Sequence, residues 1–309
     1  MSVENIQFQG LRGELRRDEP MSRHVSWKAG GPADRFFAPA DLEDLSAFLG
    51  QLPPQEPILF VGLGSNLLVR EGGWRGTVIL TYAASKRPRM DDGLLYAEAG
   101  VACPRLARFA ADHNLGSAEW LTGIPGTVGG ALAGNAGCYG GETWNYVERV
   151  LMLDRHGARV ERSAGDFAIG YRHAGLQSVT DEWFAAAWLR FPAGNRQQSR
   201  ERIQNLLERR IATQPLQQPN AGSVFRNPPG DHAARLIEAA GLKRFAIGGA
   251  QVSEKHANFI VNPDNTATAG EIEMLIGQVQ AAVKEKFGVE LLREVRIVGE
   301  HKVVEGTMA

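Results

Sequence analysis

Two glycine-rich segments contain the residues whose types and spacing could bind a ligand through the main chain. The first, VGLGSNLLV at residues 61–69, places Gly62, Gly64, Ser65 and Asn66 between two apolar runs. Residues with so little side-chain bulk let a phosphate or a ring approach the backbone N–H groups, which together form an anion-binding concavity. Taken alone, such a segment is more often a plain hairpin turn. A Rossmann domain is not expected, because the third glycine is missing and LLVR is typical of a strand.

The second segment, WLTGIPGTVGGALAGNAGCYGGE at residues 120–142, is the stronger candidate. A stretch so poor in side chains cannot build its own core, and a long ordered loop in a compact domain is usually functional. VGGALAG after PGT predicts a short helix whose first N–H groups could face a pyrophosphate. A flexible linker is the alternative, but the stretch lacks the Ser-rich or charged character of linkers. A membrane helix is excluded because the apolar run is short and contains Asn135.

These segments belong to a longer series of motifs along the chain. GYR at 170–172, AGSVFRNP at 221–228 and EVRIVG at 294–299 follow them, and SWKAGGPADRF precedes them from residue 26. With these motifs in this order, the chain resembles the UDP-N-acetylenolpyruvoylglucosamine reductase family, MurB, over nearly its whole length. The compact segment with Gln214 and Pro215 before AGSVFRNP resembles the shorter subtype of that family.

The resemblance implies an α+β fold with the MurB and vanillyl-alcohol-oxidase-like flavoprotein architecture. Its FAD-binding region would have two parts, residues 1–83 with 298–309 and residues 84–200. Residues 201–297 would form a C-terminal α+β substrate domain. The mixture of hairpins and scattered helices also favours α+β over a doubly wound parallel sheet.

The resemblance also implies a reaction with noncovalent FAD, NADPH as hydride donor and a UDP-sugar substrate. Hydride would pass from NADPH to FAD, and then to the methylene carbon of the enolpyruvyl ether on UDP-N-acetylglucosamine. The product would be UDP-N-acetylmuramate, a cell-wall precursor. The residues expected to bind FAD lie in the two glycine-rich segments: Gly62, Gly64, Ser65, Asn66, Leu67, Gly123, Pro125, Gly126, Thr127, Gly129, Gly130, Asn135 and Gly137.

Three side chains match the needs of that reaction. Charge that moves onto the substrate carboxylate must be stabilised, and the planar fork of Arg172 can hold a carboxylate by two-point contact. The resemblance assigns proton donation to Ser223 and places Glu294 beside the reacting carbons. Alternation in a half-buried strand would also explain a charge at Glu294. Tyr171 and Asn227 are carried over as substrate-binding residues.

Other positions near these motifs stay open. Gln214, Lys255 and His256 are candidate substrate contacts without an assigned role. Ala174 stands where the family often has a serine, two positions after the arginine of GYR. This departure puts a hydroxyl group at that site in doubt and leaves the arginine unaffected.

Local patterns predict the elements that position these residues. A helix is expected over residues 104–114, and YVERVLMLD should turn at residues 155–157 into ARVERS. Amphipathic helices are expected over residues 195–213 and 269–287. A short helix should start near Asp231 with Gly241 as its C-cap, and LLREVRIV should form the last strand.

Composition excludes several classes of protein. The chain has 309 residues, of which 43% are hydrophobic and 22% charged, and its formal net charge is -1. A nucleic-acid binder would concentrate Lys and Arg into a basic stripe, which is missing here. Cys103 and Cys138 are too few for a disulfide framework and match no metal pattern, so reduced thiols and no metal site are expected. The amino terminus lacks a signal-type core, and no apolar run is long enough for a bilayer, which favours the cytoplasm without membrane attachment.

Two other functions compete with the reductase. An FAD oxidase of the broader flavoprotein architecture would pass electrons to oxygen and could tether its flavin covalently, but such enzymes usually have a larger substrate domain. A UDP-sugar binding module without catalysis would need no flavin. The visible spectrum of the purified protein separates this module from both flavoenzymes.

Overall fold

The computed structural model describes residues 7–83, 86–177 and 181–302, which form two compact units. The first unit combines Met1–Arg16, Phe36–Leu63 and Val78–Arg210, and the second combines Arg17–Arg35, Gly64–Thr77 and Ile211–Ala309. Within the described ranges, no helix has both the length and the apolar character needed to cross a bilayer. The three functional parts expected from the sequence stay a prediction, because compactness alone does not assign a role to a segment.

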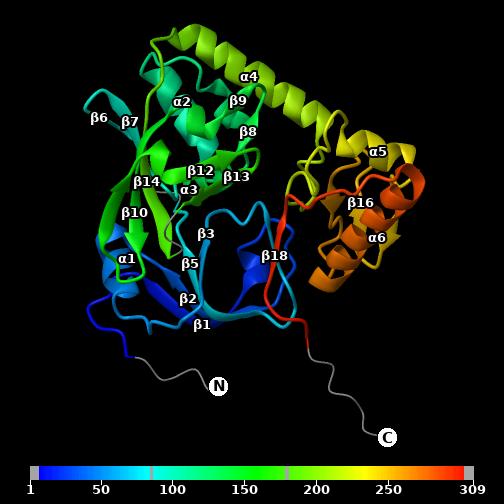
Figure 1. Ribbon diagram of the computed structural model, residues 1–309, viewed down its shortest axis with the longest axis horizontal. Coiled ribbons are helices and arrows are strands. Elements are labelled where there is room, and N and C mark those ends of the chain that lie inside the picture. The colour runs from blue at the N-terminus through cyan, green and yellow to red at the C-terminus, as the bar shows by residue number, and fades with distance from the viewer. Residues whose placement is uncertain (1–6, 84–85, 178–180, 303–309) are drawn as a thin grey trace, which may run out of the picture. The chain divides into compact units, whose positions relative to one another are not determined.

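A five-stranded antiparallel sheet forms the frame of the first unit (Figure 1). Its order is β11-β10-β14-β7-β6, with bounds Arg159–Arg162, Val147–Asp154, Glu182–Leu189, Leu94–Glu98 and Arg89–Asp91. In the β10–β11 hairpin, Val150 pairs with Arg162 and Leu153 with Arg159. This confirms the hairpin predicted from the sequence.

A second, four-stranded sheet lies earlier in the chain. Its order is β1-β2-β5-β3, with bounds Glu14–Pro20, Pro32–Ala38, Trp74–Leu80 and Ile58–Val61. Helix α1 (Leu42–Leu49) begins at the N-cap Asp41, which accepts a hydrogen bond from the Asp44 N–H at 2.9 Å. Its apolar face, with Leu45, Phe48 and Leu49, is buried.

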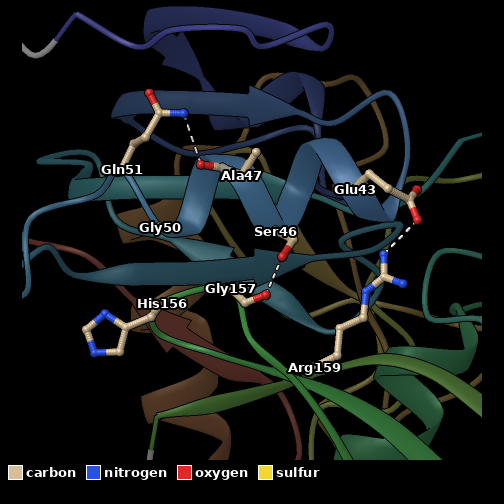
Figure 2. Close-up of a pocket in the computed structure, with 8 residues that line it drawn as sticks. All are labelled: Glu43, Ser46, Ala47, Gly50, Gln51, His156, Gly157 and Arg159. Carbon is tan, nitrogen blue, oxygen red and sulfur yellow. Dashed lines mark hydrogen bonds and ion pairs between the residues drawn. The ribbon is translucent and has the colours of Figure 1, made fainter.

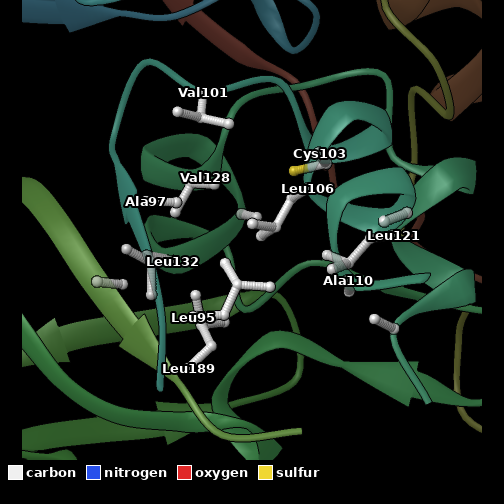
Figure 3. Packing of buried hydrophobic residues seen from close by; sticks show 14 of the residues in the cluster. Leu95, Ala97, Val101, Cys103, Leu106, Ala110, Leu121, Val128, Leu132 and Leu189 are labelled. Carbon is white, nitrogen blue, oxygen red and sulfur yellow. The ribbon is translucent and has the colours of Figure 1, made fainter. Parts of the chain in front are cut away.

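One face of the five-stranded sheet packs on α2 (Cys103–Asp112) and α3 (Val128–Ala133). Figure 3 shows the shared core, to which β7 contributes Leu95 and Ala97, α2 contributes Leu106, and α3 contributes Val128 and Leu132. This burial holds one side of α3 in place, while its Gly130 and Ala133 are exposed. The helix predicted over residues 104–114 is therefore confirmed as α2, and the short helix in the second glycine-rich segment as α3.

Short elements complete the first unit around these helices. The segment before α3 forms the 3-10 helix η2 (Glu119–Gly123), and β8 (Gly137–Cys138) pairs with β9 (Gly141–Glu142) after it. Two further 3-10 turns are η3 (Thr143–Asn145) and η4 (Ala164–Asp166). A second hairpin joins β12 (Phe167–Gly170) to β13 (His173–Leu176), so that Tyr171 and Arg172 form its turn.

The second unit is built on two helices and two small sheets. Its helices are α5 (Ala233–Ala239) and α6 (Ala269–Phe287), and η1 (Met21–Arg23) is a 3-10 turn. Strand β4 (Leu67–Val69) pairs in parallel with β18 (Arg296–Val298), and a three-stranded sheet contains β15 (Ala246–Ile247), β16 (Ala250–Val252) and β17 (Ile260–Val261). The predicted stripe of α6 is buried in a core that includes Trp27 and Phe225. Figure 1 shows α6 beside β16, in agreement with their contacts.

Three sequence predictions need adjustment. The last strand covers only Arg296–Val298, because residues 292–295 pair with the irregular segment around Val224 instead of extending β18. Ala240 rather than Gly241 is the C-cap of α5, and Gly241 follows it with φ +79°. Helix α4 (Arg196–Thr213) matches the predicted range, but Ile211 of its predicted apolar stripe is 59% exposed.

The two cysteines are free thiols in the first unit, as predicted. Cys103 is fully buried at the start of α2, and burial raises its pKa. Cys138 donates a hydrogen bond from Sγ to the Trp120 carbonyl at 3.1 Å. Burial raises the pKa of Cys138 to about 11, so its thiol is protonated at neutral pH.

This protonation predicts low reactivity toward alkylating agents. At pH 8 we expect the native Cys138 to react with iodoacetamide about a hundredfold more slowly than a free thiol, because only the thiolate is nucleophilic. Cys103 should react only after unfolding. Mass spectrometry of trapped time points would measure both rates, and denatured protein gives the control. Rapid alkylation of both native thiols would contradict this packing.

Candidate functional site

The two predicted ligand segments meet in the first unit at Gly62 and Thr127. A Cβ added at Gly62 would lie 2.3 Å from the Thr127 Oγ1 and 2.9 Å from its Cγ2. No side chain fits at such distances, which explains why a glycine follows β3. Thr127 is itself buried and is the N-cap of α3. The close approach brings the backbone of the first segment to the start of the short helix in the second.

The first amides of α3 have partners within the protein. The Val128 N–H donates to the Val101 carbonyl and the Gly129 N–H to the Ala99 carbonyl, each at 2.8 Å. The Cys103 N–H donates to the Gly126 carbonyl at 3.0 Å. The expectation that the first N–H groups of this helix face a pyrophosphate is therefore wrong for Val128 and Gly129.

Asn135 connects the second segment to the hairpin that carries Arg172. Its side chain is 2% exposed and its backbone is left-handed, with φ +38°. The Asn135 Nδ2 donates to the Gly170 carbonyl at 3.1 Å and to the Glu142 Oε2 at 3.3 Å, and its Oδ1 accepts from the Trp144 N–H at 3.2 Å. These contacts bind β12, β9 and η3 to one buried amide.

Arg172 lies at the turn of this hairpin, next to the second segment. Its Nη2 donates to the Gly137 carbonyl at 3.1 Å, and its Cζ lies 5.2 Å from the centre of the Tyr171 ring. Tyr171 is 50% exposed. The structure thus brings together Asn135, Gly137 and Arg172, which the sequence had placed in two separate motifs. Guanidinium groups bind carboxylates through paired N–H groups, which is the chemistry expected of Arg172 from the sequence.

The second unit brings Ser223, Glu294 and Asn66 together through the main chain. The Glu294 N–H donates to the Val224 carbonyl at 2.8 Å, so the segments that carry Ser223 and Glu294 are direct neighbours. The Asn66 Nδ2 donates to the Glu294 carbonyl at 3.2 Å, and the Arg296 N–H donates to the Asn66 carbonyl at 3.0 Å. Glu294 precedes β18, so strand alternation does not account for its position.

The other predicted residues of the second unit have varied surroundings. The Gly64 carbonyl accepts from the Ser26 N–H at 3.1 Å, and Ser65 occupies the turn that leads to Leu67 at the start of β4. The Asn227 Oδ1 accepts from the Ala233 N–H at 3.1 Å. The side-chain oxygen of Asn227 thus binds the first residue of α5 and already has a partner within the protein.

Some buried polar atoms of the predicted segments lack a hydrogen-bond partner in the described part of the chain. The Trp120 Nε1 and the Thr122 Oγ1 are buried and have no hydrogen-bond partner within the described part of the chain. The His256 Nδ1 is buried in the same way, and its ring meets Phe259 edge-on at 4.7 Å. Burial lowers the pKa of His256. Unsatisfied buried polar atoms are uncommon, and they point to places where a ligand could complete the pairing.

A separate surface pocket of ≈ 750 Å³ lies between α1 and the turn of the β10–β11 hairpin, and Figure 2 shows its lining. None of the predicted site residues lines it. Its polar groups already pair: Glu43 with Arg159 at 2.7 Å, and the Ser46 hydroxyl with the Gly157 carbonyl. Over the described residues, no group of three or more His, Cys, Asp and Glu side chains could hold a metal ion.

Comparison with known proteins identifies the segments. Residues 33–163 match the FAD binding domain family, and residues 214–298 match the C-terminal domain of UDP-N-acetylenolpyruvoylglucosamine reductase. Proteins named UDP-N-acetylenolpyruvoylglucosamine reductase are 55% identical in Thiobacillus denitrificans (94% of this chain, 94% of the relative) and 56% identical in Alkalilimnicola ehrlichii (93% and 96%). The crystal structure of the reductase from Thermus caldophilus aligns with a TM-score of 0.77 at 30% identity, covering 93% of this chain and 99% of the other.

Two neighbouring glycines of α3 differ in their surroundings. A Cβ added at Gly130 would have only the Thr127 Oγ1 within 4 Å, at 3.9 Å, so no protein atom requires a glycine there. At Gly129, by contrast, an added Cβ would lie 2.8 Å from the Ala99 Cβ. The packing of the protein therefore explains a glycine at position 129, whereas the space beside Gly130 is open to a ligand.

We therefore predict that Gly130→Val abolishes FAD binding without loss of stability, because its side chain would collide only with the cofactor. The ratio of flavin absorbance to protein, with the melting temperature of the apoprotein, measures both effects. Ala133→Val is the matched control: it adds a branched side chain at another exposed position of α3 and should retain FAD. Gly129→Val should lower the melting temperature as well. Full flavin occupancy in Gly130→Val would exclude close approach at this residue.

Proposed function

The chain belongs to the UDP-N-acetylenolpyruvoylglucosamine reductase family, and we propose from this membership which of its residues carry the reaction. It is an FAD-dependent oxidoreductase that reduces the enolpyruvyl group of UDP-N-acetylenolpyruvoylglucosamine to UDP-N-acetylmuramate, with NADPH as donor. The observation that carries this function is the identity of 52% to 56% to reductases over 93% to 96% of the chain. FAD, when bound, accepts hydride from NADPH and supplies it to the substrate.

Arg172 stabilises the carboxylate of the substrate in this proposal. Hydride addition at the methylene carbon moves negative charge toward the adjacent carbon and its carboxylate, where fixed hydrogen-bond donors lower the barrier. The contact between the Arg172 Nη2 and the Gly137 carbonyl, at 3.1 Å, limits the rotation of the guanidinium. A preorganised fork of this kind costs little reorganisation when the charge appears.

Ser223 donates the proton that completes the addition. The carbon that bears the carboxylate becomes strongly basic once hydride has been added at its neighbour, so a weak acid within hydrogen-bond reach can protonate it. The backbone on both sides of Ser223 is fixed: the Gly222 N–H donates to the Asn220 Oδ1 at 3.0 Å, and the Val224 N–H donates to the Asn258 carbonyl at 2.9 Å.

Glu294 lies beside the reacting carbons in this proposal, and the remaining predicted residues bind the substrate or FAD. The N–H of Glu294 donates to the Val224 carbonyl at 2.8 Å, which supports a joint role with Ser223. Tyr171 and Asn227 contact the substrate, and the residues of the two glycine-rich segments contact FAD. The function of residues 1–83 with 298–309 and of 84–200 in FAD binding, and of 201–297 in substrate binding, is part of the same proposal.

The reaction has a place in the cell that follows from its chemistry. The product is a precursor for peptidoglycan synthesis, so we assign the chain to cell-wall formation and thereby to cell shape and division. Its nucleotide-sugar substrate and NADPH are charged, soluble metabolites, which favours a cytoplasmic location. The visible spectrum of the purified protein, followed anaerobically as NADPH and then the enolpyruvyl nucleotide are added, tests the whole assignment. A purified protein that binds no flavin, or a bound flavin that NADPH does not bleach, would refute it.

We predict that Ser223→Ala separates the two half reactions. NADPH should bleach the flavin at near the parent rate, because the hydroxyl acts only after hydride has reached the substrate. Reoxidation by the enolpyruvyl nucleotide should slow by about two to four powers of ten, as is typical for loss of a proton donor. Stopped-flow absorbance measures both rates. Ser223→Cys should recover part of the loss. If Ser223→Ala slowed both half reactions equally, or slowed neither, the proton-donor role would be removed.

We also predict that Arg172→Lys slows reoxidation by about one to two powers of ten while flavin reduction is retained. Lysine keeps the charge and loses the planar fork, so the two-point contact with the carboxylate is lost. The same stopped-flow experiment measures the effect, with substrate varied to reach saturation. Arg190→Lys is a suitable control, because Arg190 pairs with Glu148 on the surface, at 3.0 Å. A parent rate in Arg172→Lys would show that the guanidinium shape is unimportant.

A further inference from the structure

A buried asparagine holds the backbone beside Ser223. The Asn258 side chain is 3% exposed. Its Oδ1 accepts from the Phe225 N–H at 3.0 Å, and its Nδ2 donates to the Phe225 carbonyl at 2.8 Å. One side-chain amide therefore binds both polar groups of a single residue, as a neighbouring strand would do. The Asn258 carbonyl also accepts from the Val224 N–H, at 2.9 Å.

The opposite side of the same segment holds the backbone of Glu294. The Val224 carbonyl accepts from the Glu294 N–H at 2.8 Å, and the Arg226 N–H donates to the Leu292 carbonyl at 2.9 Å. Residues 224–226 therefore lie between Asn258 and residues 292–294. They do not form a regular strand, so neighbouring strands do not provide all of their hydrogen-bond partners. A shift of this segment would move Ser223 and Glu294 together.

We infer that Asn258 is a positioning residue for Ser223 and Glu294, an inference that rests on the function proposed above. It touches neither substrate nor cofactor atoms in this role. It fixes the peptide groups of Phe225, two positions after Ser223, because Phe225 is buried and the Asn258 side chain binds both its N–H and its carbonyl group. A displacement of about 1 Å is enough to lower a rate by about a hundredfold.

Asn262 provides a matched control in the same unit. It is 0% exposed, its Nδ2 donates to the Trp27 carbonyl at 2.9 Å, and its Oδ1 accepts from the Ala267 N–H at 2.9 Å. Asn262 thus has comparable burial and the same types of hydrogen bond, but its side-chain partners are remote in sequence from Ser223 and Glu294, and its main-chain bond to the Pro219 carbonyl is retained in an alanine variant. Replacing it measures what the loss of a buried amide does to the protein in general.

The test compares half reactions in the holoenzyme. Asn258→Ala should slow flavin reoxidation by the enolpyruvyl nucleotide about tenfold to a hundredfold, and flavin reduction by NADPH should stay within about twofold of the parent. Asn262→Ala should lower the melting temperature without this separation of the two rates. If Asn258→Ala fails to fold, Asn258→Asp keeps the size and the acceptor, loses the Nδ2 donor, and should give the same separation.

A double-mutant cycle identifies the residue through which Asn258 acts. Adding Asn258→Ala to Ser223→Ala should slow reoxidation by a smaller factor than Asn258→Ala does in the parent, because one of the two residues that it positions is already absent. Independent, multiplied effects, or the same separation of rates in Asn262→Ala, would overturn the inference and leave the role of Ser223 intact. If Ser223→Ala alone leaves reoxidation unchanged, the proposed function of Ser223 and the inference fall together.

Discussion

Irregular backbone in a protein interior must find a partner for each peptide N–H and carbonyl group, and buried asparagines supply these partners in this chain. Asn135 binds the Gly170 carbonyl and the Trp144 N–H, and Asn258 binds both polar groups of Phe225. A buried group left without a partner costs about 1 to 3 kcal/mol. The loops that carry Arg172 and Ser223 can therefore be irregular and still hold fixed positions.

The same requirement limits how the glycine-rich segments can bind an anion. A helix N-terminus is a common phosphate site because its first amides have no partner within the helix. In α3, the amides of Val128 and Gly129 instead join the helix to the backbone before α2. This attachment holds the short helix against the core, and Gly62 can then approach Thr127 closely. In the FAD site that we propose, bare main chain at a fixed position contributes more than a helix dipole.

The sequence predicted elements that are determined locally and missed contacts that join distant segments. Helix α6 and the β10–β11 hairpin follow from periodicity and turn residues within their own ranges, and both were predicted closely. The last strand was predicted too long, because residues 292–295 bind the backbone around Val224. Asn258 was missed because its partner Phe225 lies 33 positions away and an asparagine has no periodic pattern. The resemblance named Ser223 and Glu294, but only the structure shows that their segments are hydrogen-bonded neighbours in the second unit.

The turn at Arg172 has a consequence for how this protein can change. Arg172 has φ +54°, a region in which residues other than glycine are strained by about 1 to 2 kcal/mol. A glycine at this position would relieve the strain and lose the guanidinium. A selection for thermal stability alone would therefore favour the substitution that removes the side chain assigned to the carboxylate. With the role that we propose for Arg172, thermostability and turnover are opposed at this residue, and a library screened only by heat would be enriched in stable enzymes with slow turnover.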